Sequence, residues 1–122
     1  MNPGGITGVL LIVLLTVLCG FGDAQGFIHA GKVWDGGVFD GSRALRSAAG
    51  FQLGVIAYWF VLRLLAEHGI VAVEVQTLFW FVATIVGVAL LNGQALRWPL
   101  IDQAIAGCVL AGVGWLMYRT TR

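Results

Sequence analysis

The chain has 122 residues, of which 59% are hydrophobic and only 11% carry a charge. A chain this small cannot bury so much apolar surface in its own core, so lipid must cover the remainder. The formal net charge of +1 argues against a basic surface of the kind that binds nucleic acid. The composition therefore predicts an integral membrane protein, with membrane lipids around it.

Four stretches are long and apolar enough, or nearly so, for helices that cross a membrane, which need about 20 mainly apolar residues. The first has no charged residue and no lysine or arginine before it, so we expect a retained helix rather than a cleaved signal peptide. The predicted spans cover about residues 5–21, 43–67, 70–91 and 99–118. The sequence thus predicts an all-α fold, a four-helix transmembrane bundle in a single domain over residues 1–122.

A glycine-rich segment, residues 22–41, separates the first two predicted helices. Its glycines are spaced so that they should interrupt a long helix. Its aromatic and branched residues are nevertheless too apolar for a freely solvated loop. We therefore expect an interfacial segment that lies along the membrane surface.

The predicted helix ends carry recognisable signals. Asp40 or Ser42 can cap the second helix, Gly69 and Gly93 offer left-handed stops after the second and third, and Pro99 fits the first turn of the fourth. The turns between helices two and three, and three and four, are short, which requires antiparallel neighbours. Both termini should then lie on one side of the membrane, here named side A, opposite side B.

The basic residues are distributed almost evenly between the two sides. Side B carries four and side A three, namely Lys32, Arg43, Arg46 and Arg97 against Arg63, Arg119 and Arg122. Because lysine and arginine set orientation, two alternatives stay open. A partner or the insertion machinery fixes one orientation, or the chain inserts both ways and forms an antiparallel dimer.

Small residues recur at four-residue spacing on three of the predicted helices. Helices in lipid associate through close backbone contact at such residues. The candidate helix-packing residues are Gly50, Gly54, Ala83, Gly87, Ala104, Cys108 and Gly112. The two cysteines, Cys19 and Cys108, are expected to behave as small hydrophobic residues, with a disulfide between the first and last helices as the alternative.

Ionisable groups at membrane depth are functional candidates, because each is costly there unless paired or hydrated. A candidate ion or polar site gathers near side A, with Gln52 deeper in helix two as an interhelical hydrogen bonder: Glu74, Arg63, Glu67, His68 and Gln52. The alternative is a mutually neutralised cluster that anchors the turn. A second polar cluster near side B comprises Arg97, Asp102 and Gln103, in which Asp102 complements the helix dipole and can pair with Arg97.

No nucleophile with an adjacent base, no metal-ligand spacing and no phosphate-binding loop occurs in the sequence, which favours a non-enzymatic protein. His29 and His68 are expected on opposite sides of the membrane, so they should not share a haem or metal. No cofactor is predicted, although a bound lipid, quinone or pigment stays an open alternative.

The leading expectation is an accessory subunit in the bacterial inner (cytoplasmic) membrane that packs against a larger membrane complex. Its partners would be other transmembrane subunits or a second copy of the chain. One alternative is a homodimeric channel or transporter, in one or both orientations, with an ion or proton site near Glu74. Another is an enzyme that acts on lipids or quinones.

Overall fold

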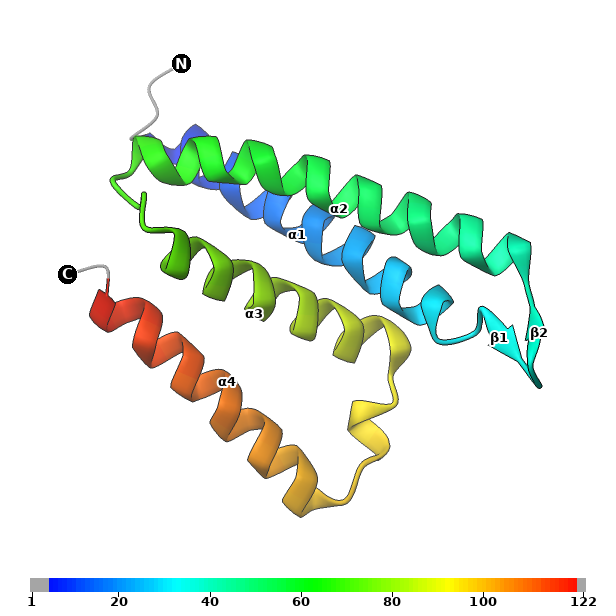
Figure 1. Ribbon diagram of the computed structural model, residues 1–122. Coiled ribbons are helices and arrows are strands. Elements are labelled where there is room, and N and C mark those ends of the chain that lie inside the picture. Colours follow the sequence, from blue (N-terminus) through cyan, green and yellow to red (C-terminus); the bar gives the residue numbers. More distant parts are fainter. Residues whose placement is uncertain (1–4, 121–122) are drawn as a thin grey trace.

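Four long helices account for most of the structure, a computed structural model that describes residues 5–120. They are α1 (Ile6–Ala30), α2 (Gly41–Glu67), α3 (Val73–Asn92) and α4 (Leu100–Thr120) (Figure 1). Each is long and apolar enough to cross a membrane, which confirms the prediction of four such helices. The chain is therefore all-helical in class, and its composition and helices together indicate an integral membrane protein.

The first helix is longer than the sequence suggested. The predicted end near residue 21 is wrong, because α1 continues without a break to Ala30 and includes Gly22 and Gly26. A glycine inside a helix costs about 1 kcal/mol relative to alanine. Both glycines are buried, and their contact with α2 offsets that cost.

A short β-hairpin follows α1, in which β1 (Trp34–Asp35) pairs antiparallel with β2 (Val38–Phe39). Gly36 and Gly37 form its two-residue turn with φ of +56° and +82°, the left-handed geometry that hairpin turns require. The predicted segment 22–41 is thus wrong as a single irregular stretch, since its first part is helical and the rest is this hairpin. Its location at the membrane surface stays a prediction.

The remaining helix ends follow the local signals. Of the two predicted caps for α2, Asp40 is the one used, since its Oδ1 accepts the Arg43 N–H at 3.0 Å. Gly69 and Gly93 have φ of +81° and +67° just beyond the ends of α2 and α3, as predicted. A single turn of 3-10 helix, η1 (Ala95–Arg97), connects α3 to α4.

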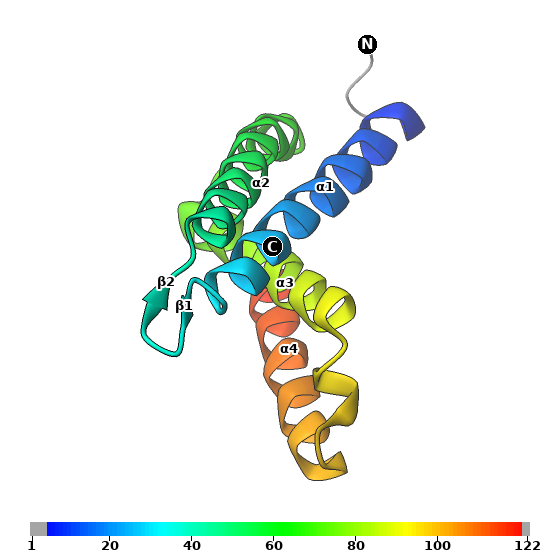
Figure 2. The same ribbon diagram turned by 90° about the vertical axis from the view of Figure 1, so that its right-hand side faces the viewer.

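The helices do not form an evenly packed four-helix bundle. α1 packs closely against both α2 and α3, whereas α4 contacts mainly α3 and diverges from the other helices (Figures 1 and 2). No residue between Leu100 and Thr120 is buried. The Ile6 end of α1 and the Thr120 end of α4 lie at the same end of the molecule (Figure 1), in agreement with the predicted arrangement of side A.

Candidate functional site

Two pairs of glycines bring α1 and α2 into backbone contact. A Cβ built on Gly22 would lie 2.7 Å from the Gly54 nitrogen, and one on Gly50 would lie 2.6 Å from the Gly26 nitrogen. No side chain fits at either position without moving a helix. The predicted packing residues Gly50 and Gly54 therefore meet a matching Gly-x-x-x-Gly pair on α1, a close approach of the kind that drives helix association in lipid.

A third glycine of α1 provides the contact with α3. A Cβ on Gly20 would lie 2.8 Å from the Ala83 carbonyl oxygen, and one on Gly87 would lie 2.5 Å from the Gly20 carbonyl oxygen. The predicted pair Ala83 and Gly87 thus lies in the α1–α3 interface. Together these contacts make α1 the central helix and draw α2 and α3 around its side-B half.

The aspartate of α1 lies where these contacts converge. Asp23 is 0% exposed. Its Oδ2 accepts a hydrogen bond from the Thr84 hydroxyl of α3 at 3.1 Å, and a second, weaker one from the Cys19 thiol at 3.6 Å. Its Oδ1 faces α2 so closely that a Cβ on Gly54 would overlap it. Three helices therefore enclose one carboxyl group.

The polar requirements of this carboxyl are only partly met. Within residues 5–120, Oδ1 has no hydrogen-bond partner, and the ion pair that occurs there joins Arg63 and Glu67 rather than any cation to Asp23. A buried carboxylate without a counter-charge is costly in an apolar medium. The Asp23 carboxyl therefore combines an unmet hydrogen bond with a missing counter-charge, both of which cost free energy in an apolar surrounding.

The position of Asp23 along α1 follows from the helix rise of about 1.5 Å per residue. Asp23 lies about 10 Å from the Ala30 end of α1 and about 26 Å from the Ile6 end, counted along the helix at that rise. Its contacts fall at the middle of α2 and past the middle of α3. The carboxyl thus lies within the part of α1 that is long and apolar enough to span a membrane, nearer the Ala30 end than the Ile6 end.

Sequence reasoning missed this site because it ended the first helix before Asp23. The spacing Cys19–Asp23 and Gly22–Gly26 was a usable signal, since residues four apart share one helical face. Read with Gly50 and Gly54, it would have suggested that α1 continues along α2.

The predicted ion or polar site near side A is not assembled into one cluster. Arg63 Nε lies 3.7 Å from Glu67 Oε1, an exposed pair, while His68 Nδ1 donates to the Leu64 carbonyl oxygen at 2.8 Å. Glu74 is exposed in the first turn of α3. Gln52 is exposed on α2 and has no hydrogen bond within the described part of the chain. Within residues 5–120, the mutual neutralisation expected of a cluster that anchors the turn extends only to Arg63 and Glu67.

The second polar cluster organises the turn before α4. Gln103 Nε2 donates to the carbonyl oxygens of Trp98 at 2.9 Å and Leu96 at 3.3 Å. Asp102 lies in the first turn of α4, as predicted for a dipole partner. Within residues 5–120, however, it forms no ion pair with Arg97. The cluster is a structural cap at side B.

The two cysteines differ in environment. Both are free, so a disulfide between the first and last helices does not form in this structure. Cys19 is buried beside Asp23, and it acts as a hydrogen-bond donor rather than only as a small hydrophobic residue. Cys108 is exposed on α4, together with Ala104 and Gly112.

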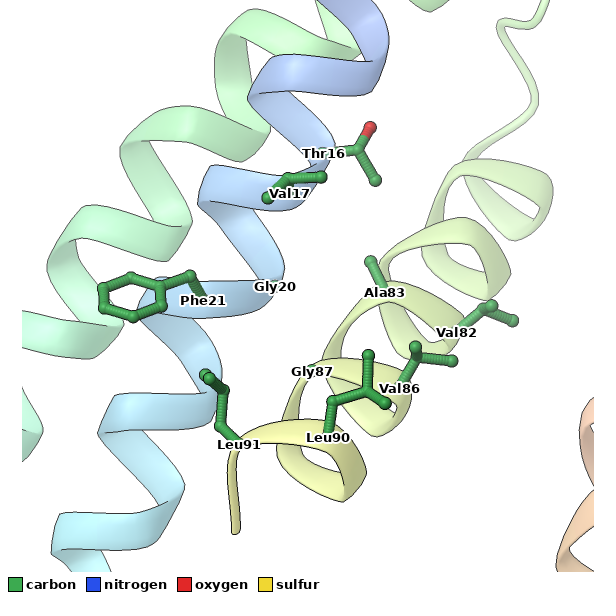
Figure 3. Close-up of a pocket in the computed structure, with 10 residues that line it drawn as sticks. All are labelled: Thr16, Val17, Gly20, Phe21, Val82, Ala83, Val86, Gly87, Leu90 and Leu91. Atoms are coloured by element: carbon green, nitrogen blue, oxygen red, sulfur yellow. The ribbon is translucent and has the colours of Figure 1, made fainter. Parts of the chain in front are cut away.

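An apolar groove of about 350 Å³ runs between α1 and α3 beside the Gly20–Gly87 contact. Side chains of both helices line it, including Val17 and Phe21 of α1 and Val86, Leu90 and Leu91 of α3 (Figure 3). Its polar side chain, Thr16, donates its hydroxyl to the Ile12 carbonyl oxygen of its own helix at 2.6 Å. The groove therefore offers an apolar surface but no chemistry.

Within residues 5–120, no three His, Cys, Asp or Glu side chains are grouped so that they could hold a metal ion. Comparison of the chain with protein-family models, curated proteins and solved structures found no match. A functional assignment must therefore rest on the residues themselves.

Proposed function

We propose that this protein is a small non-enzymatic membrane subunit that packs against a larger membrane complex through α4. The exposure of α4 is the observation that supports the proposal. This helix is apolar enough to span a membrane, yet none of its residues is buried. α1, by contrast, has seven buried residues. A helix with so little contact to its own chain has most of its surface free for another.

The small residues of α4 point away from α3. At about 100° per residue, Ala104, Cys108 and Gly112 lie about 180° from the half-buried face of the helix, which consists of Gln103, Ala106, Leu110, Val113 and Met117. Gly112 has no atom within 4 Å of where a Cβ would be. Such a face lets another helix backbone approach, so the expected partner is a transmembrane helix of a different chain.

Native mass spectrometry after purification in mild detergent tests this proposal. Wild type should co-purify with larger, different chains, and the double substitution Ala104→Leu and Gly112→Leu should abolish that association. Val109→Leu, on the same helix but off this face, is the matched control and should retain it. If the chain purifies without other proteins, or if both variants retain the same partners, the role of α4 is refuted.

A homodimeric channel or transporter is the second candidate, and the buried carboxyl of Asp23 is the observation that favours it. Ionisable side chains inside a membrane commonly belong to ion pathways. A complex that contains only two copies of this chain, with flux that Asp23→Asn abolishes in vesicles, would support this candidate. Loss of flux in Glu74→Gln instead would favour an ion site near Glu74 at side A.

The bacterial cytoplasmic membrane is the location we propose, and membrane fractionation tests it. An enzyme acting on lipids or quinones is a third alternative that no contact in the described residues favours. A bound lipid, quinone or pigment would be detected as added mass in the same native spectra.

A further inference from the structure

We propose that a groove between α1 and α2 at side B binds one anionic phospholipid, whose phosphate lies at Arg46 and whose acyl chain follows Phe21 and Leu53. The inference rests on a membrane location of the chain, but not on the partner of α4. Two features support it, an uncompensated positive charge and a change from polar to apolar lining along the groove.

Basic side chains gather where α1 ends and α2 begins, at the end of the molecule that carries the hairpin (Figure 1). They are His29, Lys32, Arg43 and Arg46. The lysine and both arginines act electrostatically on the histidine ring. Within residues 5–120, none of these side chains forms an ion pair with a carboxylate. A basic cluster between membrane helices favours an anionic lipid headgroup as its ligand.

Two members of this cluster present donors to the groove. Arg43 Nη1 donates to His29 Nδ1 at 3.0 Å, because a guanidinium has no acceptor atom. Nε2 of the neutral imidazole then carries a hydrogen that it can donate. The Arg46 side chain has neither a hydrogen bond nor an ion pair in the described part of the chain. Since both His29 and Arg46 line the groove, a phosphate there would meet one neutral and one charged donor.

The groove has a volume of about 300 Å³, and its lining changes from polar to apolar along its length. On α1, His29, Gln25 and Phe21 line it at four-residue spacing, which puts them on one face of the helix. On α2, Arg46 and Leu53 line it about two turns apart. The two helices are antiparallel (Figure 1), so both series run from the hairpin end into the molecule.

This order matches the order of groups in a phospholipid, in which the phosphate is outermost, the ester carbonyls follow and the acyl chains are deepest. Counted along α1, Gln25 lies about 6 Å and Phe21 about 12 Å deeper than His29. The Gln25 amide has no hydrogen bond within residues 5–120, so it can donate to an ester carbonyl oxygen. The groove is too small for a whole phospholipid, and the rest of the lipid therefore stays in the bilayer.

Other occupants fit the groove less well. A free inorganic anion would satisfy Arg46 but leave the apolar part at Phe21 and Leu53 uncovered. A membrane helix is about 10 Å wide and too large for this volume. A zwitterionic lipid would bring its own cation next to Arg46. An anionic phospholipid supplies both the negative charge and the apolar chain.

Native mass spectrometry of the full chain, purified in mild detergent and titrated with lipid, tests the site. We expect one phosphatidylglycerol to bind per chain, more tightly than phosphatidylcholine with the same acyl chains. Arg46→Gln should weaken the binding of phosphatidylglycerol roughly fivefold, the contribution of one basic residue near an anionic membrane surface. Equal affinity for the two lipids would overturn the proposal.

Arg97→Gln is the matched control for charge, because Arg97 belongs to η1 and does not line the groove. Its effect on the affinity for phosphatidylglycerol should be much smaller. An equal loss in the two variants would indicate a general attraction of anionic lipid to this side, and it would refute a specific site.

A pair of alanine substitutions tests whether the lipid occupies the groove itself. Ala49 lines the groove, whereas the adjacent Ala48 does not, and both are exposed, so circular dichroism should show wild-type helicity for both variants. Ala49→Trp should remove the complex with one lipid, and Ala48→Trp should retain it. Equal binding by these two variants would exclude the groove. Millimolar inorganic phosphate should not displace the lipid, and displacement would instead assign the site to a free anion and refute the lipid.

Discussion

Gly50→Ala tests whether backbone contact between α1 and α2 holds the described structure together. The added methyl carbon would lie 2.6 Å from the Gly26 nitrogen and 2.8 Å from the Gly22 carbonyl oxygen. Carbon atoms normally contact other heavy atoms at about 3.5 Å or more. Since both obstacles are backbone atoms, no side-chain rotation relieves the overlap, and the two helices must move apart by about 1 Å.

The magnitude has two opposing parts. Overpacking of this kind costs typically about 1–3 kcal/mol. Alanine, however, favours a helix over glycine by about 1 kcal/mol, which acts in the opposite direction. We expect a net loss of up to about 2 kcal/mol in the free energy of unfolding, and Asp23 should become less tightly enclosed.

Gly107→Ala is the matched control, because a Cβ at this helical position of α4 has no atom within 4 Å. It should therefore show only the gain in helix propensity. Unfolding in bilayer-like micelles by added dodecyl sulfate, followed by circular dichroism, gives both free energies. If the two variants change stability by the same amount, the close contact of α1 with α2 does not contribute and the reasoning fails.

Three further changes are predicted in the same assay or a local one. Gly87→Ala places a methyl 2.5 Å from the Gly20 carbonyl oxygen and should destabilise the protein by about 1–2 kcal/mol; an unchanged midpoint would contradict the α1–α3 contact. Glu67→Gln removes an exposed pair with Arg63 and should change stability by less than about 0.5 kcal/mol, whereas a larger loss would reveal coupling. Gly37 has a φ of +82°, so Gly37→Ala should destabilise the hairpin by about 1 kcal/mol. Amide exchange should then become faster in the hairpin alone. Exchange at the wild-type rate would argue against the tight turn.

The sequence by itself determined which segments are long and apolar enough to cross a membrane, because hydrophobicity summed over about 20 residues is a local property. It also placed two helix ends. Gly69 and Gly93 terminate α2 and α3 in the left-handed conformation that glycine adopts without a steric penalty. Asp40 was one of two predicted caps for α2, and both predictions used only the residues next to the helix start.

The end of α1 and the burial of Asp23 were decided only by tertiary structure. Locally, Gly22 and Gly26 resemble helix breakers, because the benefit of their missing side chains depends on α2, which begins eleven residues after α1 ends. Because α1 continues, Cys19 and Asp23 lie on the same inward-facing side of this helix. The Thr84 hydroxyl of α3 then donates a hydrogen bond to the Asp23 carboxyl. Helix propensity acts within one turn, whereas close packing acts between segments far apart in the chain, and in α1 the packing outweighs the propensity.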